Sequence, residues 1–489
     1  MKRREFCRTS LAAGVIAAYP FMINAAFAQS AVAAATLEGA EVEISAAAVR
    51  AFATHLDGAL LMQGDTQYDS ARMIWNGMWD KHPALIARCA NTADVQHAVT
   101  FATEHNLLLA VRGGGHSWPG KSVCDKGLMI DLADMHTVTA DPVKRRAYAQ
   151  GGALLNGLDT AALHHGLVTT AGVVSHTGVG GFTLGGGFGR LNRKYGLAVD
   201  NLVSVRLVTA DGQIRTVNAE QEPDLFWAVR GGGGNFGVAT EFEYRLHPFD
   251  RNVLSGIIVW PIEQARAVLD FYAGWYAGLS DDLYVGPTMM TLPEVGSVVA
   301  MEVVYAGDPA DGEKELAPLR AIGTPIEDGV KVQDYMVLQT HEDAALAHGV
   351  RSYAKNGMAK EFTPALADAM IESFVPNPNL MFFTHTSGGA VGRVPELATA
   401  FPHRNAETMV AVAGVWMDPA MDDELIGIAR NWFKQLAPFT GGYYSNIDFD
   451  EANPGGKNYG PAYKRLSEIK GKYDPGNLFR LNRNILPAV

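Results

Sequence analysis

One segment in the first quarter of the chain places a histidine directly after three glycines. It reads Arg112, Gly113, Gly114, Gly115, His116, Ser117. Glycine lets the backbone approach a ligand closely and turn its N–H groups toward an anion. The imidazole adds a ring nitrogen that is available to a ligand when it is neutral. Two interpretations are open for the segment alone: a loop whose histidine hydrogen-bonds a phosphate, and a histidine that anchors a ligand covalently.

Four glycine clusters of this kind fall within about 125 residues. The other three are Gly178–Gly181, Gly185–Gly189 and Gly231–Gly237. Glycine inside regular structure weakens a fold, so four clusters flanked by strand-like sequence indicate compensating contacts with a ligand. None of them combines the strand–Gly-x-Gly-x-x-Gly–helix context with an acidic residue about 20 positions later, which argues against a Rossmann site.

The sequence around the clusters predicts the elements that hold them. Short apolar runs predict strands at 84–89, 107–112, 128–132, 147–151, 202–209 and 242–246. Apolar residues at helical spacing predict helices at 46–62, 91–104 and 154–163. Ala210-Asp211-Gly212 is typical of a hairpin turn. The first glycine cluster therefore follows directly from a strand.

After about Asp250 the pattern changes to longer elements. Strands are predicted at 253–260 and 298–305, and helices at 262–278, 364–374 and 422–436. This alternation favours a sheet covered by helices on one face. At the other end of the chain, we expect the Ala-rich segment up to about Ile44 to be mobile.

Two further motifs complete the pattern. Asp224-Leu-Phe-Trp227 precedes Arg230-Gly-Gly-Gly-Gly-Asn-Phe-Gly237, and Lys472-Tyr-Asp474-Pro475 lies near the C-terminus. Together with the glycine clusters, they resemble the berberine-bridge-enzyme-like branch of the FAD-linked oxidases, within the vanillyl-alcohol-oxidase superfamily. The resemblance covers essentially all of residues 64–484.

This resemblance implies an α+β fold in three parts. A two-part PCMH-type FAD-binding domain is expected at residues 45–248. A substrate-binding domain with an antiparallel sheet covered by helices is expected at 249–443. A C-terminal segment, 444–489, is expected to return to the FAD-binding domain.

The resemblance also implies how FAD is held. In the family, the histidine that matches His116 is bonded to the ring methyl of FAD. Many members add a second bond from a cysteine four positions before Gly178, where this sequence has Val174, so a single link through His116 is expected. The other residues expected to bind the cofactor are Arg112, Gly113, Gly114, Gly115, Ser117, Thr177, Gly178, Gly180, Gly181, Gly186, Gly187, Gly237, Val238 and Asn482.

Two residues are predicted to act in catalysis. Tyr444, in Tyr444-Ser445-Asn446, matches a family tyrosine that helps to deprotonate a hydroxyl or amine. A free phenol titrates near 10 and needs a cation or hydrogen bonds to act near neutrality, so a simple wall position is the alternative. His385 occupies a position where relatives often carry an active-site polar group, with a purely structural role as the alternative. His176 is expected near the flavin ring.

The resemblance implies a function: an FAD-dependent oxidase that removes a hydride from a small organic alcohol, phenol or amine and reduces O2 to H2O2. The small Thr177 favours oxygen as acceptor. Alternatives are a flavin dehydrogenase with a non-oxygen acceptor, a sugar or oligosaccharide oxidase, and a secreted binding protein that keeps only the fold. The missing second-link cysteine argues against the sugar oxidase, because open oligosaccharide grooves usually accompany the double link in this family.

Charge and the N-terminus limit partners and location. The formal net charge of −12 without a long basic run argues against a nucleic-acid partner. Arg3-Arg4-Glu5-Phe6, the apolar run 11–27 and Ala26-Phe27-Ala28 predict a twin-arginine signal peptide at residues 1–28, and hence a periplasmic or secreted protein. An uncleaved anchor is the alternative, although Pro20 and Asn24 interrupt the run. No other stretch is apolar enough to span a membrane. The three cysteines have no metal-site spacing and allow at most one disulfide after cleavage.

Overall fold

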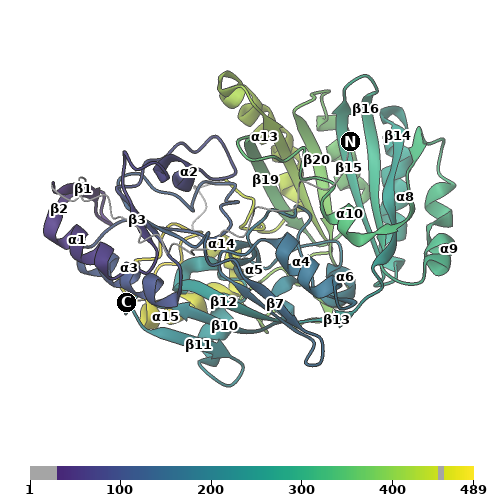
Figure 1. Ribbon diagram of the computed structural model, residues 1–489. Coiled ribbons are helices and arrows are strands. Elements are labelled where there is room, and N and C mark those ends of the chain that lie inside the picture. The colour runs from purple at the N-terminus through teal and green to yellow at the C-terminus, as the bar shows by residue number, and fades with distance from the viewer. Residues whose placement is uncertain (1–29, 450–455, 489) are drawn as a thin grey trace, which may run out of the picture.

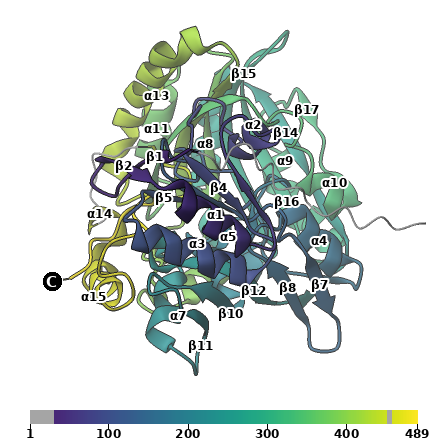
Figure 2. The ribbon, with the colours of Figure 1, turned by 60° about the vertical axis from the view of Figure 1, so that its left-hand side comes forward.

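The computed structural model describes residues 30–449 and 456–488, which form two neighbouring domains (Figure 1). The glycine domain contains elements β1 (Val32–Ala35) to β13 (His247–Pro248) together with α14 (Gly456–Tyr459) and α15 (Tyr463–Tyr473). The sheet domain contains elements β14 (Asn252–Pro261) to α13 (Asp422–Leu436). The chain leaves the glycine domain once, builds the sheet domain and then returns, so that the C-terminal helix α15 lies beside α7 (Pro223–Val229) (Figure 2).

The first part of the glycine domain is a small mixed sheet in the order β3-β4-β6-β5, in which β4, β5 and β6 run parallel. Asn91 caps helix α3 by accepting hydrogen bonds from Ala93 N and Asp94 N, as the predicted helix start requires. The elements of this part are β1 (Val32–Ala35), β2 (Glu41–Ile44), α1 (Ala46–Thr54), β3 (Ala59–Leu61), α2 (Tyr68–Arg72), β4 (Leu85–Arg88), α3 (Thr92–Glu104), β5 (Leu109–Arg112) and β6 (Leu128–Asp131).

Two predictions for this part are wrong. The expected helix at 46–62 ends at Thr54, because the chain then turns into strand β3, which pairs with β4. The segment expected to be mobile contains the β1–β2 hairpin, whose Ala34 and Ile44 pack into the same core as α3. Alternating burial of small side chains in a two-stranded hairpin leaves little apolar pattern in the sequence.

The second part is an antiparallel sheet in the order β11-β10-β12-β8-β7. The predicted hairpin at 210–212 is confirmed, since β10 pairs with β11 from Val208–Ile214 outward. The elements are β7 (Val138–Asp141), β8 (Arg146–Gln150), α4 (Leu155–Leu163), β9 (Leu167–Val168), α5 (Val179–Leu184), α6 (Asn192–Tyr195), β10 (Leu202–Val208), β11 (Ile214–Asn218), α7 (Pro223–Val229), β12 (Val238–Arg245) and β13 (His247–Pro248).

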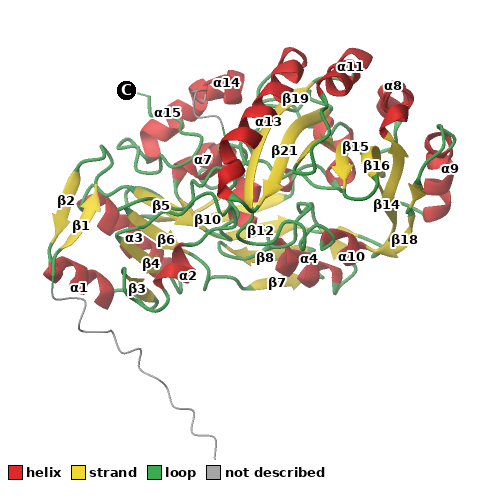
Figure 3. Ribbon diagram, turned by 90° about the horizontal axis from the view of Figure 1, so that it is seen from above, coloured by secondary structure: helices red, strands yellow, loops and turns green. Residues whose placement is uncertain are grey.

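The sheet domain contains one eight-stranded antiparallel sheet in the order β17-β14-β16-β15-β20-β21-β19, with β18 beside β14. Helices α8, α9, α11 and α13 lie along its outer face (Figure 3), as predicted, and bury residues such as Trp260, Phe382 and Trp432. Helices α10 and α12 instead contact α4 and α6 of the glycine domain. The strands are β14 (Asn252–Pro261), β15 (Leu283–Leu292), β16 (Gly296–Tyr305), β17 (Glu327–Asp328), β18 (Lys331–Asp334), β19 (Arg351–Ala359), β20 (Leu380–Thr386) and β21 (Thr408–Trp416). The helices are α8 (Ala265–Trp275), α9 (Pro309–Arg320), α10 (Tyr335–Gln339), α11 (Pro364–Ser373), α12 (Gly389–Arg393) and α13 (Asp422–Leu436).

A buried ion pair holds the returning C-terminal segment, which contains α14 (Gly456–Tyr459) and α15 (Tyr463–Tyr473). Lys470 Nζ donates to Asp474 Oδ2 at 2.6 Å, and both side chains are fully buried. Burial lowers the pKa of Lys470, and the carboxylate opposes this by raising it. The ammonium also donates to the carbonyl oxygens of Asn235, in the last glycine cluster, and Phe479. Asp474 of the Lys472-Tyr-Asp474-Pro475 motif is thus linked through Lys470 to the last glycine cluster.

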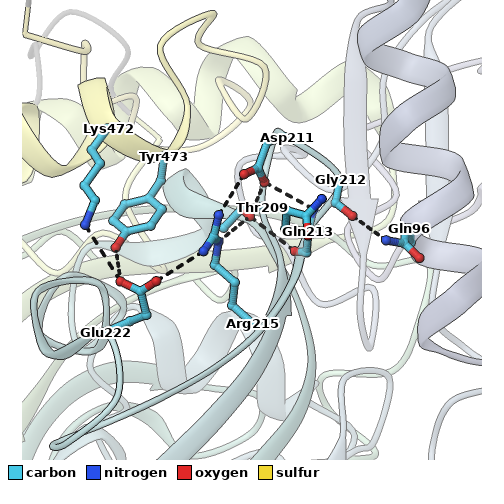
Figure 4. Close-up of polar contacts among 9 residues, drawn as sticks. All are labelled: Gln96, Thr209, Asp211, Gly212, Gln213, Arg215, Glu222, Lys472 and Tyr473. Carbon is cyan, nitrogen blue, oxygen red and sulfur yellow. Dashed lines mark hydrogen bonds and ion pairs between the residues drawn. The ribbon is translucent and has the colours of Figure 1, made fainter.

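A second network ties the end of α15 to the β10–β11 hairpin (Figure 4). Glu222 accepts a hydrogen bond from the Tyr473 hydroxyl and a 3.1 Å hydrogen bond from Arg215 Nη1. Arg215 Nη2 in turn donates to Asp211 Oδ2 in the hairpin turn, at 2.7 Å. Gln96 Nε2 on α3 donates to Gly212 O at 2.6 Å, so the hairpin connects both parts of the glycine domain.

Cys89 and Cys124 are both buried and unpaired, so the described residues contain no disulfide. Cys124 lies in an apolar cluster, as expected for a small hydrophobic side chain. Within residues 30–449 and 456–488, no helix combines the length and the apolar character needed to cross a membrane.

Candidate functional site

A cavity of about 740 Å³ lies between the two domains and is lined by residues from all three predicted parts: 45–248, 249–443 and 444–489. Glycine clusters and the His116 segment form one side, and the inner faces of β14, β15, β16, β20 and β21 form the other. The returning C-terminal segment contributes Tyr444, Tyr459 and Asn482. The cavity volume lies within the range of about 300–1,000 Å³ that is typical of ligand sites.

Two glycine clusters touch backbone to backbone at one end of this cavity. A Cβ on Gly114 would lie 2.4 Å from Gly178 Cα, and a Cβ on Gly178 would lie 2.4 Å from Gly114 N. No side chain fits at either position, because backbone atoms cannot move away as a flexible side chain could. Gly178 also forms a bridge to Leu154, which directly precedes α4. These glycines therefore allow the contact that shapes the cavity wall.

His116 stands in this wall as a buried, neutral imidazole. Its ring stacks on Trp75 with a centroid distance of 4.3 Å and lies 5.1 Å from the His176 ring. Burial, followed by the nearby His176, lowers the pKa of His116 to about 3. Its Nε2 has no hydrogen-bond partner among the described residues. A buried nitrogen without a partner is costly in a finished core and indicates a group that the ring is prepared to meet.

Most of the predicted cofactor-binding residues line the cavity: Gly113, Gly114, Gly115, His116, Ser117, Thr177, Gly178, Gly180, Gly181, Gly237, Val238 and Asn482. Arg112, Gly186 and Gly187 do not. Arg112 turns back into the sheet, where its Nη1 donates to Asp131 at 2.8 Å. The other two make room for side chains, since a Cβ on Gly186 would lie 2.8 Å from Phe401 and one on Gly187 would lie 2.4 Å from the Ala198 Cβ.

Gly187 also fixes Tyr444. The Tyr444 hydroxyl oxygen accepts hydrogen bonds from Gly187 N at 3.2 Å and from Asn446 Nδ2 at 2.7 Å. Asn356 on β19 holds the Tyr444 backbone through both its N–H and its carbonyl. Burial raises the pKa of the phenol to about 12, although the two donors oppose this shift. The Tyr444 proton therefore stays on the oxygen near neutral pH and is free to point toward a ligand.

His385 lines the same cavity from β20. Its Nδ1 lies 2.9 Å from the Tyr284 hydroxyl, and its ring stacks near Phe188 at 6.3 Å. Burial lowers the pKa of His385 to about 4, so the ring is neutral at pH 7. Phe188 also contacts Tyr444 edge-to-face at 5.0 Å, so both predicted catalytic residues lie near the Phe188 ring.

An ion pair that the sequence did not indicate also lines the cavity. Arg190 Nε donates to Glu302 Oε1 at 2.7 Å, with Arg190 almost fully buried and Glu302 about one quarter exposed. Arg190 directly follows the third glycine cluster, but Glu302 stands alone in an apolar strand, and no spacing connects them. The one available signal was a single carboxylate inside the run 298–305.

The cavity fits FAD better than it fits a metal ion. Its glycine-rich side offers backbone N–H groups, and the unpartnered His116 nitrogen is available to contact a ligand. By contrast, no group of three or more His, Cys, Asp or Glu in the described parts of the chain is arranged to hold a metal. Of the residues above, His116, Ser117, Thr177 and Asn482 are the side chains in position to hold the cofactor.

Comparison with known families agrees with this interpretation. Residues 83–218 match the model of an FAD binding domain. Residues 442–486 match the model described as berberine and berberine like. The first match contains the His116 segment and three strands of the mixed sheet, and the second contains Tyr444 and the buried ion pair of the returning segment.

Individual relatives span nearly the whole chain. An FAD-linked oxidoreductase of Dictyostelium discoideum is 31% identical, over 90% of this chain and 97% of its own. The (R)-6-hydroxynicotine oxidase of Paenarthrobacter nicotinovorans is 31% identical, over 88% of this chain and 97% of its own. The crystal structure of 6-hydroxy-D-nicotine oxidase from Arthrobacter nicotinovorans matches with a TM-score of 0.81 and 29% identity, covering 88% of this chain and 98% of that one.

The glycine contact generates a prediction. Gly114→Ala should remove bound FAD and destabilise the protein by about 3 kcal/mol, because the new methyl group meets backbone that cannot yield. The ratio of flavin absorbance to protein and the thermal unfolding midpoint measure the two effects. Gly157→Ala in α4 is the matched control: its new Cβ would meet one side-chain atom at 3.4 Å. We expect that control to keep FAD and its free energy of unfolding to rise by up to about 1 kcal/mol. Normal flavin content in Gly114→Ala would contradict the role of this contact.

Proposed function

Because the chain belongs to the berberine-bridge-enzyme-like family of FAD-linked oxidoreductases, we propose that it is an oxidase of a small organic alcohol, phenol or amine that passes electrons to O2 and forms H2O2. The single observation that carries this proposal is the cavity, which runs without a break from the glycine clusters to the inner face of the sheet. A cofactor on one side and a substrate on the other would share one enclosed space.

The chain's own residues supply positioning and proton transfer. Bound FAD supplies the hydride acceptor. Tyr444 keeps its proton near pH 7 and can donate a hydrogen bond to the oxygen or nitrogen of the substrate. His385 is neutral and can accept the proton that the substrate loses, which it then releases again because burial lowers its pKa to about 4. Proton uptake at its Nε2 requires the tautomer in which Nδ1–H donates to the Tyr284 hydroxyl.

We propose His116 as the one covalent attachment point for FAD. The neutral ring with a free Nε2 supports this assignment, since a protonated imidazole cannot form a new bond at nitrogen. Val174, which stands where bicovalent relatives carry cysteine, lines the cavity but offers no nucleophile. Both cysteines in the described residues are buried in apolar clusters.

His116→Ala should therefore release its flavin. In the wild-type protein, we expect flavin absorbance to remain with the pellet after acid precipitation, and in the variant to move to the supernatant. His176→Ala serves as the matched control, because it removes the neighbouring ring and should leave the bond intact. Flavin that stays bonded in His116→Ala would contradict the assignment, and flavin released from the wild-type protein would contradict covalent attachment altogether.

Oxygen is the proposed electron acceptor, and Thr177 supports it as a small residue in the cavity wall. A screen for H2O2 with phenolics, alkaloids, hydroxy acids and sugars tests the reaction, and stopped-flow reoxidation of the reduced enzyme tests the acceptor. Thr177→Leu should slow reoxidation on the order of tenfold, which is about 1.4 kcal/mol in the barrier. Thr177→Val, close in shape to threonine, should behave like the wild type. Sluggish reoxidation of the wild-type enzyme would favour the dehydrogenase alternative.

We further propose twin-arginine export to the periplasm or beyond. The motif that supports it, Arg3-Arg4, lies outside the residues that the structure describes. Replacing both arginines with lysine should keep the protein in the cytoplasm, whereas Arg8→Lys, the matched control, should be exported and begin near Gln29. Cell fractionation and N-terminal sequencing measure both. Export of the double-lysine variant would contradict the proposal.

A further inference from the structure

The sheet side of the cavity is an apolar wall with one carboxylate in it. Apolar side chains come from four neighbouring strands: Ile257, Val259, Met290, Val298, Met381 and Phe383. Among the described strand residues that line the cavity, Glu302 is the one acidic side chain. Thr288 and His385 are its polar neighbours on β15 and β20. Such a wall suits a ligand with an apolar body and few polar groups.

Glu302 lines the cavity and is partly accessible from it. In the sheet register it lies opposite Ile257 on β14 and opposite Gly286 on β15. Gly286 carries no side chain itself, and a Cβ there would lie 3.0 Å from Thr384 O and 3.2 Å from the Tyr284 hydroxyl oxygen. The Glu302 side chain remains about one quarter exposed to the cavity. A ligand can therefore reach this carboxylate from within the cavity.

Arg190 holds the Glu302 carboxylate in place from the opposite domain. Besides its 2.7 Å bond to Glu302 Oε1, the guanidinium donates to Val173 O at 3.3 Å and to Gln339 Oε1 at 3.1 Å. Gln339 is itself fixed by donating to Gly172 O at 2.9 Å. A charged, positioned acceptor with an oxygen left for a ligand binds a donor more strongly than a neutral one does.

We propose that Glu302 is the specificity-determining residue of this site, and that the substrate is an apolar, aromatic-sized molecule whose O–H or N–H donates to this carboxylate. This proposal rests on the proposed function and names its substrate class. The apolar wall excludes sugars as substrates. A sugar carries hydroxyl groups on every side, and against Met290, Met381 and Phe383 these would lose their hydrogen bonds to water without gaining new partners.

A matched pair of ligands tests the proposal on the intact flavoprotein without turnover. Phenol has an O–H donor, and anisole has the same ring with the donor methylated. Titration calorimetry, together with perturbation of the visible flavin spectrum, gives both affinities. We expect the wild-type protein to bind phenol about tenfold or more tightly than anisole, as for a hydrogen bond to a charged acceptor. Cellobiose should bind more weakly than either ligand.

Variants assign that preference to one residue. Glu302→Gln should reduce the ratio of phenol affinity to anisole affinity by at least about fivefold, because the acceptor loses its charge. If that variant does not fold with Arg190 left unpaired, the double replacement Arg190→Met and Glu302→Met removes both charges and should bring the ratio near one. Glu342→Gln is the matched control, since Glu342 also lines the cavity but lies outside the sheet. It should leave the ratio unchanged.

Each other outcome overturns the proposal. These are absence of phenol binding, a wild-type ratio near one, an unchanged ratio after removal of the Glu302 carboxylate, and cellobiose as the tightest ligand. Failure of the proposed oxidase function is distinguishable, because binding needs no reaction with oxygen. An intact flavin spectrum with no phenol preference rejects the role of Glu302 alone, whereas absence of bound flavin rejects the function itself.

Discussion

The contact between Gly114 and Gly178 is the constraint on which the site depends. Two loops that carry different parts of the wall meet there with backbone against backbone, and a Cβ on either glycine would overlap the other at 2.4 Å. The contact fixes where the His116 segment lies relative to the segment after Val174. Next to it, His116 stacks on Trp75 and is left with a nitrogen that no described residue bonds. Close backbone approach thus holds the loop histidine as a buried, neutral imidazole in the cavity wall.

The return of the chain is the second requirement, because the cavity needs residues from its far end. Lys470 and Asp474 are buried as a pair in the glycine domain, and the lysine reaches the carbonyl of Asn235 in the last glycine cluster. Losing one partner of such a pair leaves a charge without compensation in the core. The pair therefore fixes the C-terminal segment to the last glycine cluster. Asn482 belongs to this segment and thereby comes to line the cavity.

The histidines and the tyrosine proposed to act in the cavity are uncharged, and the carboxylate of its sheet wall is paired. This limits the chemistry that the site can perform. Burial leaves His116 and His385 uncharged at pH 7, with pKa values of about 3 and 4. Tyr444 keeps its proton for the same reason. Glu302 carries a charge, and Arg190 compensates it across the boundary between the domains. Neutral acids and bases beside the one carboxylate of the sheet wall suit hydride removal from a neutral, largely apolar substrate.

The sequence by itself determined the local elements and the motif-bearing loops. The capped helix α3, the β10–β11 hairpin and helix α13 follow from backbone preferences over a few residues. Only the tertiary structure decided that Gly187 supports Tyr444, 257 positions away, and that Arg190 meets Glu302, 112 positions away. The physical reason is that a side chain's partner across such a separation is chosen by the packing of whole sheets and domains. The spacing of residues within a short stretch of sequence therefore does not indicate which distant residue becomes the partner.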